Sequence, residues 1–203
     1  MVFQRNTTTF LWWIVFIIVT GAYMEEQMLL LVDEKGDFTK KYAPRSICHT
    51  GKGKRHLAFT MLIYNSDRKI LLQHRKHRLF DRLWDLAGAS HPLHLGNRDE
   101  TMQEAASRFL LGEWGIEGLK VEDIGGFNYF AEYGEKCENE HCRLLIAEFN
   151  GELKPSEQHA YGYKWVSLGE LLKDIIRNQK IYTPWLIVSV EELLKHPLGK
   201  KLK

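Results

Sequence analysis

The sequence predicts one α+β or α/β domain in which helices and a sheet pack as a sandwich. Short aliphatic runs bounded by turn residues alternate with stretches of helical periodicity, and several helix starts carry their own capping residues. Hydrophobic residues make up 44% of the 203 residues and charged residues 27%, which is typical of a globular chain long enough to bury a core. No repeat, linker or low-complexity segment divides the chain.

Residues 1–23 are a separate hydrophobic segment. Residues 10–18 form an unbroken apolar run with a single charge before it. This run is shorter than the ~20 apolar residues of a membrane-spanning helix, so it matches a signal-peptide core, a marginal anchor or an extension upstream of a start at Met24. We favour the extension, because ordinary soluble sequence begins there. We therefore expect the folded domain at residues 24–203, a cytoplasmic location, and membrane contact or tethering only through residues 10–23.

The first half of the domain reads mainly as strands. Residues 27–32 are a short apolar strand that turns at residues 34–37. Residues 56–64 are rich in aliphatic and aromatic side chains and form a second strand. The turn at residues 65–68 brings back residues 69–75 as its hairpin partner.

The second half mixes strands and helices. Small side chains in residues 83–92 favour strand and loop. A helix begins near residues 97–99, where Asn and Asp are good N-caps, and ends at Gly115. Residues 119–130 and 141–149 are further strands. Two more helices begin at the capping box of Ser167 and Glu170 and at the Thr183-Pro184 pair.

Five potential metal ligands lie in three well-separated pieces of the chain: His49 with His56, then His91, then Glu138 with Glu140. Three imidazoles and two carboxylates suit one divalent cation such as Mn²⁺, Mg²⁺ or Zn²⁺. The two glutamates are two residues apart in a predicted strand, so their side chains point to the same face. The pattern predicts one shared metal site.

Glu113 shares a face of the predicted middle helix with Ala106, Phe109 and Leu110, which are core residues at helical spacing. A buried carboxylate there needs a metal, a base or a hydrogen-bond donor. The alternative is a carboxylate near enough to the helix end to be solvated, and the spacing alone favours neither.

Composition excludes some classes of function. The net charge of +2 is too near neutral to indicate a nucleic-acid binder. Three cysteines, an odd number without a CxxC pair, argue against a disulfide framework and for a reducing compartment.

From Met24 onward the chain resembles type 1 isopentenyl diphosphate isomerase, a branch of the Nudix superfamily. Each matching piece is weak alone, and together they occur in the family's order at near the expected spacing. The pieces are LLLVD (29–33), His49, HLAF (56–59), LLQHR (71–75), Trp84, SHP (90–92), EWGI (113–116), Tyr129, ENE (138–140) and TPW (183–185).

The resemblance implies a Nudix-type α/β/α sandwich with a mixed central sheet, and a small-molecule diphosphate as substrate. It implies that the five His and Glu residues bind one octahedral metal, while Glu113 helps to hold a Mg²⁺ on the substrate diphosphate. Implied substrate-binding residues are Arg75, Trp185 and either Arg45 or Lys41, and Tyr129 lies near the proton-transfer carboxylate Glu140.

The chemistry explains this set of groups. Moving a double bond along a five-carbon chain requires adding a proton at one carbon and removing one from another, through a tertiary carbocation. An acid–base pair must flank the hydrocarbon, an aromatic face can stabilise the cation, and a dry pocket protects it from water. The family places a cysteine where this chain has Ala89, and a methyl group carries no proton. Neither Ser90 nor Cys142 is a good replacement, and His159 stands where the family usually has Glu.

Two other functions remain open. A Nudix diphosphate hydrolase uses a glutamate-rich box to bind several metals and activate water. Glu100, Arg108, Glu113 and Gly115 fit that frame, whereas Phe109 and Gly112 replace two metal-binding glutamates. The third possibility is a catalytically silent binder of prenyl diphosphates or metal.

Overall fold

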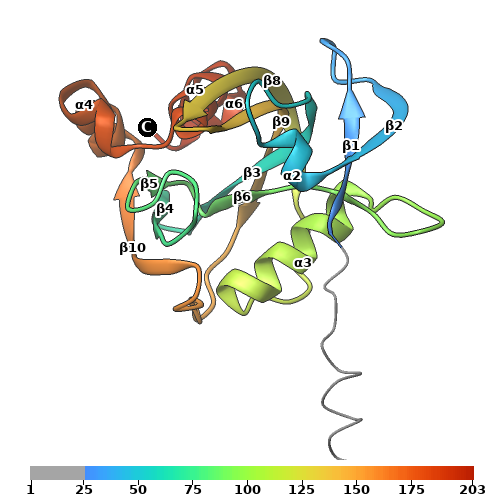
Figure 1. Ribbon diagram of the computed structural model, residues 1–203. Coiled ribbons are helices and arrows are strands. Elements are labelled where there is room, and N and C mark those ends of the chain that lie inside the picture. Colours follow the sequence, from blue (N-terminus) through green and yellow to red (C-terminus); the bar gives the residue numbers. More distant parts are fainter. Residues whose placement is uncertain (1–25) are drawn as a thin grey trace, which may run out of the picture.

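A computed structural model describes residues 26–203 of the chain (Figure 1). The hydrophobic segment 1–23 and the start expected at Met24 lie outside the described residues. The strands are β1 Met28–Val32, β2 Phe38–Pro44, β3 His56–Tyr64, β4 Lys69–Arg75, β5 Trp84–Asp85, β6 Gly88–Ser90, β7 Leu93–His94, β8 Glu122–Tyr133, β9 Lys136–Glu148 and β10 Ala160–Ser167. The helices are α2 Arg45–Cys48, α3 Met102–Trp114, α4 Leu168–Asn178, α5 Pro184–Lys195 and α6 Pro197–Lys201, with the 3-10 turn η1 Gln179–Ile181.

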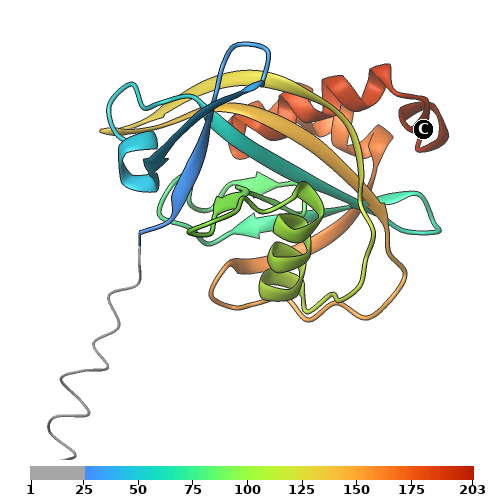
Figure 2. The same cartoon turned by 90° about the vertical axis from the view of Figure 1, so that its right-hand side faces the viewer.

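The α+β sandwich is confirmed. Helix α3 lies on one face of the sheet, and the C-terminal helices α4 to α6 lie on the other (Figures 1 and 2). Strand β3 contributes to both cores, because Phe59 and Met61 pack toward α3 while Leu62 packs with residues of α5. This alternation is the two-residue period of a strand. Among residues 26–203, no helix has the length and apolar character that a membrane crossing requires.

The central sheet is mixed. Strand β3 runs parallel to β9 in a register that starts with His56 opposite Glu140 and ends with Tyr64 opposite Glu148. Strand β9 also pairs antiparallel with β8, and β6 lies antiparallel along the other edge of β3. Almost every residue of β3 is buried, as expected for a central strand covered on both faces.

The expected hairpin of residues 56–64 and 69–75 is only partly right. The turn at residues 65–68 forms, but β4 pairs with β3 at one position, Tyr64 opposite Ile70. Beyond it β4 diverges and pairs with β10 along its whole length. Local turn residues predicted the reversal of the chain, whereas the strand partners depend on segments that are distant in sequence.

The start of helix α3 was also predicted wrongly. Its N-cap is Thr101 rather than a residue of 97–99, because Thr101 and Glu104 form a capping box. Asp99 instead accepts hydrogen bonds from Tyr42 and His94. The other helix ends were predicted correctly: Gly115 ends α3 with a left-handed backbone, and Ser167 and Thr183 cap α4 and α5.

Candidate metal centre

The five predicted ligands meet at one end of β3 and β9. Their candidate ligand atoms all lie within 4.8 Å of one another, and all five side chains are buried. The parallel register of β3 and β9 places two of them side by side, and the segment between β6 and β7 adds a third. The five are His49 after α2, His56 on β3, His91, and Glu138 and Glu140 on β9.

Backbone hydrogen bonds orient two of the imidazoles. The Nδ1 of His49 lies 2.8 Å from the carbonyl oxygen of Arg45, and the Nδ1 of His56 lies 2.8 Å from that of Lys54. A carbonyl only accepts, so each Nδ1 carries a proton, and the Nε2 of the neutral ring presents a lone pair to the cluster. This is the arrangement in which an imidazole binds a metal.

Three of the inward-facing atoms lack hydrogen-bond partners within residues 26–203, whereas the Nε2 of His91 lies 3.0 Å from a carboxylate oxygen of Glu140. The Nε2 of His49 lies 3.0 Å from a carboxylate oxygen of Glu138, yet neither atom makes a hydrogen bond, and the Nε2 of His56 also lacks one. An unprotonated nitrogen facing a carboxylate needs a cation between them. The donor set, the geometry and these unpartnered atoms therefore fit a divalent cation.

The ionisation of the cluster agrees with this interpretation. Burial lowers the pKa of His56, but the neighbouring groups of Cys48 and Glu140, together with the charge of Glu140, raise it to about 10. Burial, followed by the positive charge of His56, holds the pKa of His91 well below its usual range. In the metal-free protein, a proton on His56 supplies positive charge beside the two carboxylates.

Tyr129 lies opposite Glu140 in the pairing of β8 with β9, and its hydroxyl donates a hydrogen bond to Oε2 of that glutamate. Burial and then the charge of Glu140 hold the pKa of Tyr129 well above its usual range. The phenol therefore remains a neutral donor beside the carboxylate.

An inner cavity of ≈ 150 Å³ adjoins the cluster. Ala89, Tyr129 and Trp185 belong to one apolar group along its wall. Glu113 also lines the cavity, where burial raises the pKa of its carboxyl to about 7 although Gln73 donates a hydrogen bond to it at 2.8 Å. The full lining is Arg45, Gln73, Arg75, His77, Ala89, Ser90, His91, Glu113, Tyr129, Glu138, Glu140, His159 and Trp185.

Asp85 accepts hydrogen bonds from two of the predicted substrate-binding residues, Arg75 and Trp185. Its side chain is fully buried and accepts hydrogen bonds from Arg75 (2.9 Å), Trp185 (2.9 Å) and Thr183 (3.0 Å). The guanidinium of Arg75 also lies over the indole of Trp185, 4.9 Å from the ring centroid. One face of the predicted aromatic wall is therefore covered by a cation of the protein itself.

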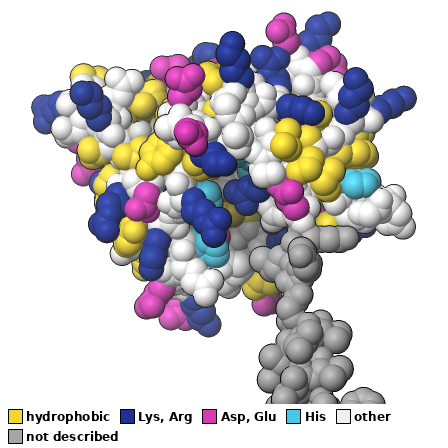
Figure 3. Space-filling model, in the orientation of Figure 1, with side chains coloured by type: hydrophobic (Ala, Val, Ile, Leu, Met, Phe, Trp, Pro, Cys, Tyr) yellow, Lys and Arg dark blue, Asp and Glu magenta, His cyan; other side chains and the backbone are white. Residues whose placement is uncertain are grey.

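A larger outer pocket of ≈ 800 Å³ shares Arg45, His77 and His159 with the inner cavity. Lys and Arg side chains gather with His side chains around a hollow on the face shown in Figure 3. Of the two alternatives left open by the sequence, Arg45 lines both spaces, whereas Lys41 is exposed on β2 and lines neither.

Sequence reasoning missed several residues of this region. His77 lies in the basic connection between β4 and β5 and was not singled out, but it is partly buried and lines both spaces. Asp85 and Gln73 were not singled out. A lone carboxylate in the apolar stretch of residues 83–86 was the one available signal for Asp85.

The residues that resemble a hydrolase box have structural contacts here. Arg108 makes two hydrogen bonds of 2.8 Å to Glu100, and the same carboxylate accepts the backbone N–H of Leu93. Phe109 is buried against Phe59, with ring centroids 5.9 Å apart. Glu100, Arg108 and Phe109 therefore serve the packing of α3, whereas Glu113 of the same frame lines the inner cavity.

Comparison with known proteins agrees with this architecture. Residues 54–186 match the family model of the NUDIX domain. The isopentenyl-diphosphate delta-isomerase of Schizosaccharomyces pombe is 30% identical, covering 83% of this chain and 82% of its own length. That of Haloarcula marismortui is 34% identical, covering 70% and 78%. A solved structure from Deinococcus radiodurans superposes with a TM-score of 0.62 at 15% identity over 81% of this chain and 98% of its own, a likeness of fold alone.

Proposed function

This chain belongs to the NUDIX family, and we propose that it is a divalent-metal-dependent isomerase that interconverts isopentenyl diphosphate and dimethylallyl diphosphate, or a diverged member of that group. The observation that carries the proposal is the buried cluster of three histidines and two glutamates, in which inward-facing atoms of His49, His56 and Glu138 lack hydrogen-bond partners within residues 26–203. Relatives named isopentenyl-diphosphate delta-isomerase support the choice of substrate.

The cluster would bind one Mg²⁺, Mn²⁺ or Zn²⁺, and a cation there would favour the ionised carboxylates and so set the acidity of Glu140. Glu140 and Tyr129 would exchange a proton with the terminal carbon of the substrate from one wall of the inner cavity. Ala89, Tyr129 and Trp185 would surround the hydrocarbon and exclude water from the carbocation.

Arg45 and Glu113 would act on the diphosphate, the first by its charge and the second by holding a Mg²⁺ that comes with the substrate. A carboxyl with a pKa near 7 ionises readily when a cation approaches, and this suits Glu113 to that role. Arg75 and Trp185 line the same cavity, and Asp85 fixes their positions.

The test is to incubate the full-length chain with isopentenyl diphosphate, Mn²⁺ and Mg²⁺ in deuterated water and to follow the products by NMR. An allylic isomer carrying deuterium supports the proposal, and Glu140→Gln should abolish it. Isomer formation by Ala89→Cys alone would identify a preserved scaffold that lacks one proton carrier. Phosphate release would favour a hydrolase, and no product from either protein would favour a silent binder.

A further inference from the structure

Helix α4 carries an apolar side chain on the face that points to solvent. Leu168 and Leu171 are buried in the core, so the opposite side of this helix would be polar in an ordinary surface helix. Ile176 lies on that side and is 84% exposed, the highest value of any large hydrophobic residue in the described part of the chain. A single exposed isoleucine is common, so the groups around it decide what it indicates.

Three cations lie around Ile176. Lys173 and Lys180 are three and four positions from it, and Arg177 in turn is four positions from Lys173. Side chains at these spacings are neighbours on a helix, and η1 continues the chain directly after α4. All three cations are exposed, and none makes a salt bridge among residues 26–203. At the upper-left corner of Figure 3, where Figure 1 places α4, Lys and Arg side chains lie beside hydrophobic ones.

Positive charge is in excess around α4. The two acidic residues of this helix are Glu170 and Asp174. Hydrogen bonds, from Ser167 and Tyr182 respectively, lower the pKa of each carboxyl most, and nearby cations lower it further. These cations are Lys69, Lys164, Lys173 and Arg177. Together with Lys180 they outnumber the two carboxylates, so this surface attracts anions.

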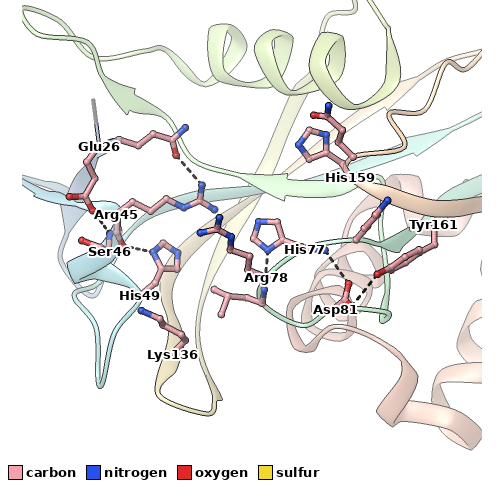
Figure 4. Close-up of a pocket in the computed structure, with 14 residues that line it drawn as sticks. Glu26, Arg45, Ser46, His49, His77, Arg78, Asp81, Lys136, His159 and Tyr161 are labelled. Carbon is pink, nitrogen blue, oxygen red and sulfur yellow. Dashed lines mark hydrogen bonds between the residues drawn. The ribbon is translucent and has the colours of Figure 1, made fainter. Parts of the chain in front are cut away.

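An apolar groove of ≈ 440 Å³ adjoins these cations at Lys180, which is its only charged lining residue. The groove runs between the start of α5 and the connection from β4 to β5, and Ile181, which follows Lys180, is 40% exposed. The exposed Glu191, one turn beyond Ile187 on α5, bounds the groove on that side. Its apolar walls are Phe80, Leu83, Pro184, Ile187 and Val188. None of its lining residues belongs to the inner cavity or to the outer pocket drawn in Figure 4.

We propose that the exposed face of α4 and this groove form a docking surface for a membrane that contains anionic phospholipids. Ile176 and Ile181 enter the boundary of the acyl chains, and the groove beside them takes part of one chain. Lys173, Arg177 and Lys180 meet the phosphate groups. A bilayer supplies apolar depth and a spread negative charge at once, which matches this surface. A second copy of the chain matches it less well, because a two-fold interface would bring the same cations face to face.

This surface belongs to the folded domain, whereas the sequence indicated membrane contact only through residues 10–23. Docking at the membrane interface requires no spanning helix. Because residues 10–23 could bind lipid by themselves, the test has to report on α4 directly.

The first test places an environment-sensitive fluorophore on the full-length variant Ile176→Cys. The three natural cysteines are buried, so labelling is directed to the introduced thiol. We expect a blue shift with vesicles of phosphatidylcholine and phosphatidylserine in equal parts, and a much smaller shift with phosphatidylcholine alone. The matched control is Leu111→Cys, since Leu111 is an exposed aliphatic residue of α3, on the other face of the sheet (Figure 1). The control label should not shift.

The second test measures the affinity of the full-length chain for the same vesicles by co-sedimentation. Lys173→Gln combined with Arg177→Gln should weaken binding about twenty-five-fold, since each cation near an anionic surface contributes about fivefold. Ile176→Ser should weaken it about tenfold, because an apolar side chain no longer enters the bilayer. The matched control is Lys40→Gln combined with Lys41→Gln, which removes the same charge from exposed positions of β2 and should bind within about twofold of the natural chain.

The absence of a blue shift at position 176, or an equal shift at position 111, would overturn the docking surface. Natural affinity in both the charge variant and Ile176→Ser would do the same. Binding that is equal for both vesicle compositions and leaves the label at position 176 unshifted would refute it in favour of contact through residues 10–23. A dimer in sedimentation velocity that Ile176→Ser dissociates, without vesicle binding, would refute it in favour of a second copy of the chain.

Discussion

Glu113→Gln should stabilise the metal-free protein, and increasingly so as the pH rises. Burial raises the pKa of Glu113 to about 7 from an ordinary 4.5, so the folded state holds its proton more tightly than the unfolded state. The ionised carboxylate therefore destabilises the fold. This loss of unfolding free energy is small below pH 4.5, grows between pH 4.5 and about pH 7, and is complete above about pH 7. Gln keeps an oxygen to accept from Gln73 but carries no charge.

The size of the effect follows from the shift. The interval from 4.5 to 7 is 2.5 pH units, and at 1.36 kcal/mol per unit it sets an upper limit of about 3 kcal/mol. Water screens part of it, because the Glu113 side chain is not completely buried. We expect the substitution to raise the free energy of unfolding by up to about 3 kcal/mol at pH 8 and by only about 1 kcal/mol at pH 5.

The measurement is urea unfolding of the natural chain and the variant at both pH values, in the presence of a chelator. The difference in the free energy of unfolding follows from the shift of the transition midpoint when the dependence on urea concentration is unchanged. The control is Glu117→Gln, which removes an exposed carboxylate shortly after the same helix and should change stability by less than about 0.5 kcal/mol at either pH. A stabilisation by Glu113→Gln that is equal at pH 5 and pH 8, or absent at both, would refute the conclusion that burial raises the pKa of Glu113.

Three further predictions concern the cluster and its surroundings. Mn²⁺ at about a hundred times its dissociation constant should stabilise the natural chain by about 2.7 kcal/mol, seen as a higher Tm, and His91→Ala should lose this response while His94→Ala keeps it. Asp85→Asn should destabilise the protein by about 3–5 kcal/mol in urea unfolding, because the buried charge of Arg75 loses its partner; a change below about 1 kcal/mol would contradict the network. Phe109→Glu, which restores a glutamate of the hydrolase frame, should destabilise by about 4 kcal/mol or more by burying an unpaired carboxylate, and a well-folded variant that releases phosphate would show this reasoning to be wrong.

Features encoded in neighbouring residues could be predicted from the sequence. The spacing of Glu138 and Glu140 places both on one face of any strand, and the structure shows both facing the same cluster. The capping residues Ser167 and Thr183 act on backbone N–H groups within three positions, so they mark the starts of α4 and α5 without help from the rest of the fold.

Features that depend on distant segments could not be predicted in this way. The partner of β4 is β10, more than eighty residues away, and the favourable turn at residues 65–68 says nothing about it. His77 looks like one of several basic residues in an exposed connection until the fold places it over the cavity. The role of Asp85 likewise depends on its hydrogen bonds with Thr183 and Trp185, which lie about a hundred positions later in the chain.

The distribution of unmatched polar groups indicates where ligands belong. Burying a polar atom without a partner destabilises a fold, so native structures pair nearly all such atoms. Among residues 26–203 five buried side-chain atoms lack a hydrogen bond, and three of them belong to His49, His56 and Glu138. Glu113 is held near neutrality in the adjoining cavity, and the Nε of Arg75, which lines the same cavity, is another of these five atoms. A divalent cation, a second cation and a phosphate oxygen would satisfy these three groups in turn. Ala89 is not one of these polar groups, so the loss of a proton carrier at this position would leave the affinity for metal and diphosphate intact. Binding and turnover can therefore be separated in this protein.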